Sequence, residues 1–379
     1  MSGSGGCRRR RAELEREGWS LPFSTLFSRG EIGQSGIPIP DRKPRMRSFF
    51  DPRQLDHAPA LEMHNGGFTA YAETPARVRS ILDAIGPTLL PGNAGEAPIL
   101  AVHDADYVDF LRNGFRLWRE AGREGDAIPY TWPVVRRRPL RLDRIDALLG
   151  RFSFDATTPL SEGTWDAVHA NAQTAIAATR AVLDGDRAAF ALCRPPGHHA
   201  GRDHYGGYCH INVAAVAAQL ARDSGVGRVA ILDIDYHHGN GTQDIFWERG
   251  DVFYASLHAD PATDYPFYWG HADEIGGGAG EGATLNLPLP RGTKVDAFRA
   301  AQAKALEALA RFGPGLLVVS FGADTWEGDP ISHLKLTTAD YAILAAEIAG
   351  CGWPTAIVME GGYAVDALGA NVASFLSGF

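Results

Sequence analysis

Residues 229–242 read VAILDIDYHHGNGT, an apolar run that breaks into carboxylates, imidazoles and glycines. The apolar start of this stretch predicts a buried strand. Side chains two residues apart in a strand point to the same side, so we expect Asp233, Asp235 and His237 to share one face where the strand ends. Carboxylate oxygen and imidazole nitrogen on one face suit zinc. Sites in open α/β sheets gather at the carboxyl ends of strands, which favours a zinc site over a solvated turn.

A catalytic zinc needs a third protein ligand and an open position for water. The apolar run 316–319 predicts another strand, and Asp324 follows it in a glycine-containing loop. Taken alone, Asp324 is more typical of a turn or a helix cap than of a ligand.

Two further turns follow strand-like runs and carry reactive side chains. The first, CRPPGHHA at residues 193–200, places His198 and His199 next to each other in a rigid turn. The second, EGGY at residues 360–363, has glycines that let the backbone turn sharply and present Tyr363. Each turn alone has an ordinary structural interpretation.

Together these segments resemble the zinc-dependent histone deacetylase and acetylpolyamine amidohydrolase family, which has the arginase–deacetylase fold. The shared motifs occur in the family's order: RPPGHH, GGYC at 206–209, DxDxHHGNGT, the Asp324 loop and EGGY. The resemblance runs from about Met46 to the C-terminus. It is strongest to the bacterial acetylpolyamine amidohydrolases, over residues 239–246, 249–253 and 329–332.

The remaining sequence predicts an α/β protein. Strand-like runs alternate with helical patterns, which indicates a mainly parallel sheet with helices on both faces. With the resemblance, this predicts a three-layer arginase–deacetylase-like architecture. Expected strands are 47–50, 188–192, 229–234, 252–256, 316–320 and 355–359, and expected helices are 104–121, 165–183, 211–222, 294–311 and 338–349.

The resemblance implies hydrolysis of an N-acyl amide by one catalytic zinc ion bound to Asp235, His237 and Asp324. His199 is then the general base and afterwards the acid for the leaving amine, with Asn240 orienting it. His198, facing Asp233, acts mainly as an electrostatic partner. Tyr363 donates its hydroxyl to the developing oxyanion.

The resemblance also implies the walls of the site and a second ion. Tyr208 and Tyr265 line a slot for an extended methylene chain, with Ile331 nearby, and the carbonyl of Gly207 accepts the substrate amide N–H. A structural potassium ion is expected behind the zinc. The matching positions are Asp233, Asp235, His237, Ser256 and Leu257.

Composition limits the class of protein. The chain has 379 residues, 45% hydrophobic and 21% charged, which is ordinary for a globular protein. A net charge of −9 argues against general nucleic-acid binding and is compatible with cationic amine ligands. We expect no membrane association, because no apolar run approaches a membrane span. The four cysteines show no paired spacing and no secretory signal is present, which predicts a cytoplasmic protein.

The domain organisation is expected to have two parts. Residues 1–45 differ in composition and are expected to be a disordered or accessory extension, and residues 46–379 form the deacetylase-like catalytic domain. Within it, residues 122–163 are rich in Arg and Pro and interrupt the α/β alternation. The polyamine branch of the family carries an insertion here that narrows the mouth of the site and helps to form a dimer, so we expect a homodimer or higher homo-oligomer.

One position departs from the polyamine branch. Polyamine-selective members carry a glutamate shortly before the turn at 161–165, where this chain has Thr157; Asp155 or Asp146 are candidate substitutes as an ammonium anchor. Small acetylated amines are therefore the first hypothesis. Other small or aryl amides, and acetyl-lysine in proteins, stay open. A non-catalytic binding protein and an arginase-like two-manganese enzyme are less favoured, because the one-zinc residues are all present.

Overall fold

The computed structural model describes residues 46–133 and 142–379. The predicted extension over residues 1–45 lies outside the described residues. A seven-stranded sheet forms the centre of the catalytic domain, with strand order β1-β4-β9-β8-β5-β6-β7 and every pairing parallel. Its strands are β1 (Arg47–Phe49), β4 (Ala188–Ala191), β5 (Val229–Asp233), β6 (Val252–Ala259), β7 (Thr284–Leu289), β8 (Leu316–Phe321) and β9 (Thr355–Met359).

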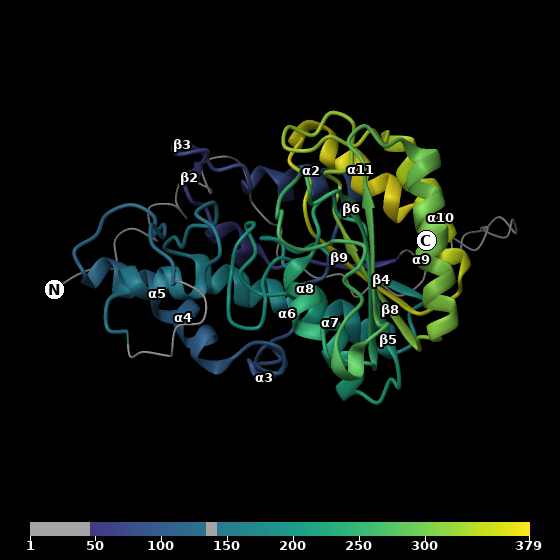
Figure 1. The fold of residues 1–379 in the computed structure, drawn as a ribbon, viewed down its shortest axis with the longest axis horizontal. Coiled ribbons are helices and arrows are strands. Elements are labelled where there is room, and N and C mark those ends of the chain that lie inside the picture. The colour runs from purple at the N-terminus through teal and green to yellow at the C-terminus, as the bar shows by residue number, and fades with distance from the viewer. Residues whose placement is uncertain (1–45, 134–141) are drawn as a thin grey trace, which may run out of the picture. The chain divides into compact units, whose positions relative to one another are not determined.

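Helices cover both faces of this sheet (Figure 1). One layer contains α6 (Thr164–Leu183), α7 (Val213–Asp223) and α8 (Asn240–Phe246). The other contains α2 (Ala76–Ile85), α9 (Val295–Phe312), α10 (Thr338–Gly350) and α11 (Val365–Leu376). This arrangement confirms the predicted three-layer α/β architecture. The remaining helical segments are η1 (Pro52–Asp56), α3 (Ala97–Leu100), α4 (Ala105–Glu120), α5 (Ile145–Phe152) and η2 (Gly278–Gly280).

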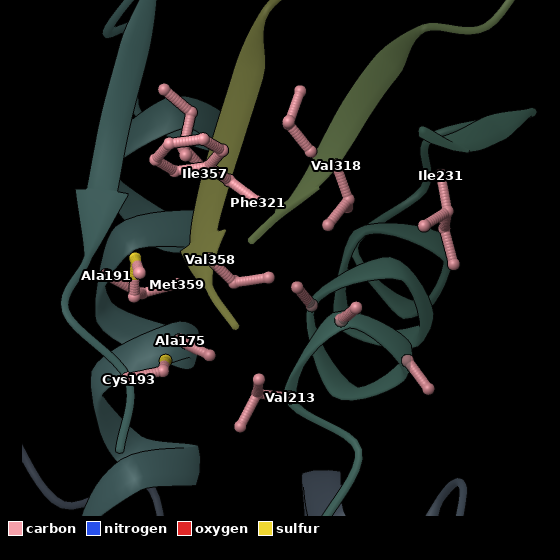
Figure 2. Packing of buried hydrophobic residues seen from close by; sticks show 14 of the residues in the cluster. Ala175, Ala191, Cys193, Val213, Ile231, Val318, Phe321, Ile357, Val358 and Met359 are labelled. Atoms are coloured by element: carbon pink, nitrogen blue, oxygen red, sulfur yellow. The ribbon is translucent and has the colours of Figure 1, made fainter. Parts of the chain in front are cut away.

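The central strands are apolar on both faces because helices cover both faces. Every residue of β5, β8 and β9 is buried. Figure 2 shows Val358 of β9 within the packed layer that contains Ala175 of α6 and Val213 of α7. On the opposite face the ring of Phe321 stacks on that of Phe375, with centroids 3.9 Å apart. This packing gives the strand ends, where the site residues lie, a rigid support.

Some elements were not predicted from the sequence. An antiparallel hairpin, β2 (Leu61–His64) and β3 (Gly67–Ala70), forms a separate two-stranded sheet. Asn65 and Gly66 both have positive φ, 50° and 79°, which is the geometry of the tight hairpin turn that Asn-Gly favours. Strand β7 was missed as well: it contains Pro288, which is tolerated because β7 lies at the edge of the sheet.

The insertion at 122–163 is described except for residues 134–141 and contains helix α5. Within the described ranges, no helix is both long enough and apolar enough to cross a membrane.

Candidate active site

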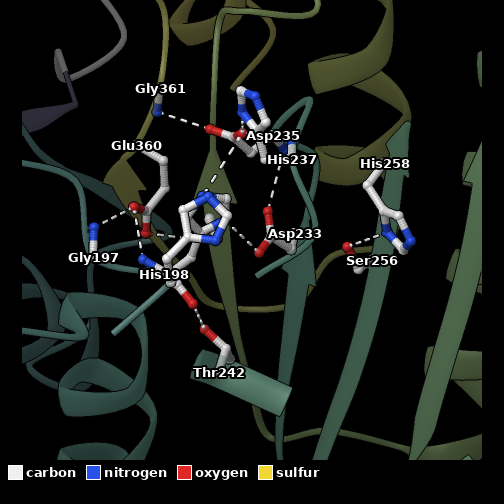
Figure 3. Close-up of polar contacts among 12 residues, drawn as sticks. Gly197, His198, Asp233, Asp235, His237, Thr242, Ser256, His258, Glu360 and Gly361 are labelled. Atoms are coloured by element: carbon white, nitrogen blue, oxygen red, sulfur yellow. Dashed lines mark hydrogen bonds and ion pairs between the residues drawn. The ribbon is translucent and has the colours of Figure 1, made fainter. Parts of the chain in front are cut away.

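Four neighbouring strands deliver the candidate residues to one edge of the sheet. Strands β4, β9, β8 and β5 are consecutive in the sheet and parallel, so their carboxyl ends meet. The turns after these strands carry the four sequence motifs. Figure 3 shows residues from three of these turns close together: His198 after β4, Asp235 and His237 after β5, and Glu360 and Gly361 after β9. The predicted convergence of the motifs is therefore observed.

Asp235, His237 and Asp324 form a buried cluster. One candidate ligand atom from each lies within 4.8 Å of the other two. His237 Nδ1 is 3.3 Å from Asp235 Oδ1 and 3.1 Å from Asp324 Oδ2. Main-chain N–H groups hold the carboxylates: Gly361 donates to Asp235 Oδ2 at 2.8 Å and Tyr236 donates to Asp324 Oδ1 at 3.0 Å. These main-chain hydrogen bonds fix the orientation of both carboxylates.

The electrostatics of this cluster fit a divalent cation. Burial and the repulsion of Asp235 raise the pKa of Asp324 to about 7. Burial alone would lower the pKa of His237, but its hydrogen bonds with Asp235 and Asp324 outweigh burial and raise the pKa to about 9. Two buried carboxylates and an imidazole, which a cation between them would stabilise, are a donor set typical of zinc.

Two glycines make room for the carboxylates. A Cβ at Gly322 would lie 2.0 Å from Asp235 Oδ2, and a Cβ at Gly361 would lie 2.4 Å from Asp324 Oδ2. Real Cβ atoms do not approach other atoms so closely, so any larger residue at either position would displace a candidate metal ligand.

The two adjacent histidines have opposite electrostatic environments. His198 Nδ1 is 3.1 Å from Asp233 Oδ2, and its Nε2 is 3.7 Å from Asp235 Oδ1. Burial opposes the charge on His198, but Asp235 and Asp233 outweigh it and raise its pKa to about 10. His199 has the opposite shift, because burial and the neighbouring His198 and His237 hold its pKa well below the usual value. His198 is therefore the cationic member of the pair.

Asn240 sets the protonation pattern of His199. Its side-chain oxygen lies 2.7 Å from His199 Nδ1, and this oxygen can only accept a hydrogen bond. Nδ1 therefore carries the proton, and Nε2 of the neutral ring is left as a base. His199 is one of the residues that line the central cavity.

Glu360 was not singled out from the sequence, yet it holds the histidine turn in place. Its carboxylate accepts the N–H groups of Gly197 at 2.6 Å and His198 at 3.1 Å, and the hydroxyl of Ser320 at 2.7 Å (Figure 3). Burial raises the pKa of Glu360 to about 7. The acidic residue of EGGY is thus a structural brace for the preceding motif.

Tyr363 lies on a turn that two distant residues support. Asp329 Oδ2 accepts the N–H of Tyr363 at 2.7 Å, and Arg77 donates to the carbonyl of Gly362 at 2.7 Å. The guanidinium carbon of Arg77 is 5.1 Å from the centroid of the Tyr363 ring. Neither supporting residue was predicted, since Arg77 comes from α2, nearly 300 positions earlier in the chain.

A cavity of about 370 Å³ opens onto these groups. All four predicted wall residues line it, and so do the site candidates His199, His237 and Tyr363. The other lining residues come from the hairpin, from Ala72 that follows it and from the insertion. The lining residues are Glu62, His64, Thr69, Ala70, Ala72, Thr157, His199, Gly207, Tyr208, His237, Tyr265, Ile331 and Tyr363.

The acid in this cavity differs from the predicted ones. Among the described lining residues, Glu62 provides the one carboxylate, and it accepts the hydroxyl of Tyr208 at 3.1 Å. Burial raises the pKa of Glu62. Asp155 and Asp146, the candidate substitutes for the missing glutamate, are not among the residues that line this cavity. Asp146 pairs instead with the guanidinium groups of Arg123 and Arg144.

Three of the five residues predicted for a potassium ion lie on adjacent strands, and the other two, Asp235 and His237, follow the end of β5. Asp233 of β5 is the register partner of Ser256 of β6, and Leu257 follows directly. The hydroxyl of Ser256 shares a 2.8 Å hydrogen bond with His258 Nδ1. Asp233, Ser256 and Leu257 are completely buried.

Comparisons with known proteins agree with this geometry. A family model described as "Histone deacetylase domain" matches residues 71–379. Acetylpolyamine amidohydrolase 1 of Pseudomonas aeruginosa is 44% identical over 344 residues, covering 88% of this chain and 99% of that protein. The acetylpolyamine amidohydrolase of Mycoplana ramosa is 46% identical over 335 residues, covering 87% and 98%.

A solved structure extends the likeness to the fold. The crystal structure of an acetylpolyamine aminohydrolase from Burkholderia pseudomallei matches with a TM-score of 0.85 and 41% identity, covering 88% of this chain and 98% of that one. The expected arginase–deacetylase fold is confirmed.

Proposed function

The chain belongs to the histone deacetylase family, and from this premise we propose that it hydrolyses the amide bond of small N-acetylated amines, with acetylpolyamines as the first substrate class. The observation that carries the proposal is the cavity. It combines His199, His237 and Tyr363 with a carboxylate, Glu62, on its wall. Such a slot suits a slender chain with an acetamide at one end and an ammonium group at the other.

Asp235, His237 and Asp324 are the proposed ligands of one zinc ion. Zinc at this position supplies Lewis acidity toward the acetamide oxygen and lowers the pKa of water. We extend the proposal to a structural potassium ion bound by Asp233, Asp235, His237, Ser256 and Leu257. Their burial beside the carboxylates supports a site for a second cation.

The proton transfers are assigned to His199. Its Nε2, left free by the Asn240 hydrogen bond, takes a proton from the attacking water and later gives it to the leaving amine. His198, paired with Asp233, contributes positive charge that stabilises the developing anion. The hydroxyl of Tyr363 donates a hydrogen bond to the oxyanion as it forms.

The walls and the overall charge favour a linear cationic substrate. The rings of Tyr208 and Tyr265 flank the methylene chain, Ile331 packs nearby, and the carbonyl of Gly207 accepts the amide N–H. Glu62 attracts the distal ammonium group, and the net charge of −9 acts in the same direction at longer range.

Thr157 supports a second candidate, because an uncharged residue lines the cavity at the position where the resemblance leads us to expect a glutamate. Neutral small amides, including aryl acetamides, are then accepted alongside the cationic ones. We also propose that the enzyme is a cytoplasmic homodimer or higher homo-oligomer, with residues 122–163 contributing to assembly and narrowing the mouth against folded proteins.

Acetate release by the purified, zinc-loaded full-length protein tests this proposal. The panel contains acetylputrescine, acetylspermidine, N-hexylacetamide, an aryl acetamide and an acetyl-lysine histone peptide, with Tyr363→Phe as the control for contaminating activity. We expect the highest kcat/KM for the acetylated polyamines. A higher kcat/KM for the histone peptide than for every small amide would contradict the small-molecule assignment, and equal rates for wild type and control would contradict catalysis itself.

A further inference from the structure

Asp155 receives an unusual number of hydrogen bonds for a side chain at the edge of a substrate cavity. Its Oδ2 accepts the N–H of Gly207 at 2.7 Å, the hydroxyl of Tyr265 at 2.8 Å and the hydroxyl of Thr157 at 2.9 Å. Its Oδ1 accepts the N–H of Thr157 at 3.1 Å. Both oxygens are thus engaged by the protein itself, and Asp155 does not line the cavity.

The donors come from three separate segments of the cavity wall. Thr157 is local to the insertion, Gly207 lies 52 residues further along the chain and Tyr265 lies 110 residues further. All three line the cavity. Hydrogen bonds to a charged acceptor are stronger than those between neutral groups, so one carboxylate holds three wall segments together.

The Gly207 turn needs such support because of its backbone conformation. Gly207 and Tyr208 both have positive φ, 55° and 66°, and a bulky residue such as tyrosine adopts this conformation only when its surroundings hold it there. Residues of the insertion hold both peptide N–H groups: Asp155 accepts that of Gly207, and the hydroxyl of Thr158 accepts that of Tyr208 at 2.8 Å. The carbonyl proposed to bind the substrate amide belongs to this turn.

Tyr265 is held at its hydroxyl end while its ring faces the reaction centre. The ring centroid is 5.2 Å from that of His199 and 6.0 Å from that of His237, both in edge-to-face contact. Because Asp155 takes up the hydroxyl, the tyrosine offers the substrate its ring and the polar end is directed into the protein. Releasing the hydroxyl frees the ring to move relative to both imidazoles.

We propose that Asp155 is a positioning residue that sets the width of the substrate slot, by clasping Tyr265, Thr157 and the Gly207 turn to one carboxylate. The inference rests on the proposed function and adds a division of roles between two acids. Glu62 lines the slot and meets the charge of the substrate, whereas Asp155 fixes the walls and meets no substrate charge.

We call the hydrogen bonds of Asp155 with Gly207, Tyr265 and Thr157 the clasp. Steady-state kinetics on a matched pair of substrates test it. N-acetylcadaverine carries a terminal ammonium group, and N-hexylacetamide has the same length without the charge. For Asp155→Ala we expect KM to rise about tenfold for both substrates, equivalent to about 1.4 kcal/mol, because the walls bind ground state and transition state alike. We expect kcat to fall by a smaller factor. Asp146→Asn is the matched control: it removes an acid of the same insertion that does not line the cavity, and its KM should equal that of wild type.

A double-mutant cycle isolates the Tyr265 arm. Tyr265→Phe alone should raise KM about threefold for both substrates, and adding it to Asp155→Ala should cause no further rise, since that hydrogen bond is already lost. If the two substitutions raise KM independently, so that their fold-changes multiply in the double mutant, the proposed role of Asp155 is wrong. A KM increase confined to N-acetylcadaverine would overturn it too, because Asp155 would then be an ammonium anchor. If Asp155→Ala does not fold, Tyr265→Phe decides alone, and an unchanged KM refutes the proposal.

Hydrogen exchange separates failure of the clasp from failure of the proposed function. The amide of Gly207 should exchange at least tenfold faster in Asp155→Ala than in wild type or Asp146→Asn, whether or not any acetamide is hydrolysed. Equal exchange in all three proteins refutes the clasp. If the wild-type protein releases no acetate, the proposed function is refuted. The exchange rate of the Gly207 amide then still tests whether Asp155 holds the cavity wall.

Discussion

Replacing Tyr363 by phenylalanine removes one hydroxyl group and leaves the turn that carries it intact. The turn depends on main-chain groups, because Asp329 accepts the Tyr363 N–H and Arg77 donates to the Gly362 carbonyl. Tyr363 lines the cavity, and the hydrogen bonds that hold it go to its main-chain N–H and carbonyl groups. Under the proposed mechanism, the substitution therefore removes a hydroxyl that donates to the reacting substrate.

The expected magnitudes differ greatly between catalysis and folding. Loss of one oxyanion donor typically lowers kcat by about 10²–10³, or about 3–4 kcal/mol. Burial raises the pKa of Tyr363 well above its usual value, so the hydroxyl stays protonated and able to donate throughout the working pH range. The free energy of unfolding should change by less than about 0.5 kcal/mol, because no hydrogen bond within the protein is lost.

Three measurements on Tyr363→Phe examine this reasoning: kcat and KM on N-acetylcadaverine, bound zinc, and urea denaturation. The matched control is Tyr208→Phe, which removes a wall hydroxyl that bonds to Glu62 and should change KM more than kcat. A Tyr363→Phe enzyme with full kcat and normal zinc content would refute the oxyanion role. A large fall in stability would instead identify the hydroxyl as structural.

The remaining predictions concern charge, metal and chain length. Glu62→Gln should raise KM roughly tenfold for N-acetylcadaverine and leave N-hexylacetamide unchanged; equal effects would contradict the ammonium contact. Because burial raises the pKa of Glu62, its charge is lost at a higher pH than that of an ordinary glutamate, so KM for the cation should climb as pH falls in wild type but not in Glu62→Gln. Asp235→Ala should lose bound zinc by elemental analysis together with activity, and full retention of both would exclude it as a ligand. Thr157→Glu should lower KM for acetylspermidine relative to N-hexylacetamide, and an unchanged ratio would show that the position does not select charge. A protein starting at Met46 should keep the kcat/KM of the full chain, and a large loss with an intact fold would show that residues 1–45 contribute to the site or to assembly.

Local patterns in the sequence were sufficient to predict the parallel sheet and the set of residues that converge. Strand periodicity predicted a common face for Asp233, Asp235 and His237. Strand β5 ends at Asp233, and the other two residues lie in the turn that follows it. The turns that carry His199 and Tyr363 were recognisable as motifs rich in Pro and Gly, but the family resemblance, and neither turn alone, made these two residues site candidates. Such features depend on near neighbours in the chain and are therefore readable without a structure.

The rest depended on contacts between distant segments. Arg77 supports the Tyr363 turn across 285 positions, and no local pattern marks it as different from other helical arginines. Asp155 looked like a candidate anchor, but its four donors include Gly207 and Tyr265, whose proximity only the tertiary structure reveals. Glu62 lies on a hairpin whose Asn-Gly signal was present and was overlooked.

The small hairpin that carries Glu62 has a consequence for how this enzyme can diverge. It forms its own two-stranded sheet, outside the seven-stranded sheet that supports the metal cluster. Its residues 61–70 are mostly exposed, with Glu62 as the buried exception. Insertions, deletions or substitutions there would exchange one amine preference for another while the catalytic machinery stays untouched. The choice of substrate can therefore evolve separately from the catalytic chemistry. A mutant library restricted to these ten positions is a compact route to new amide specificities.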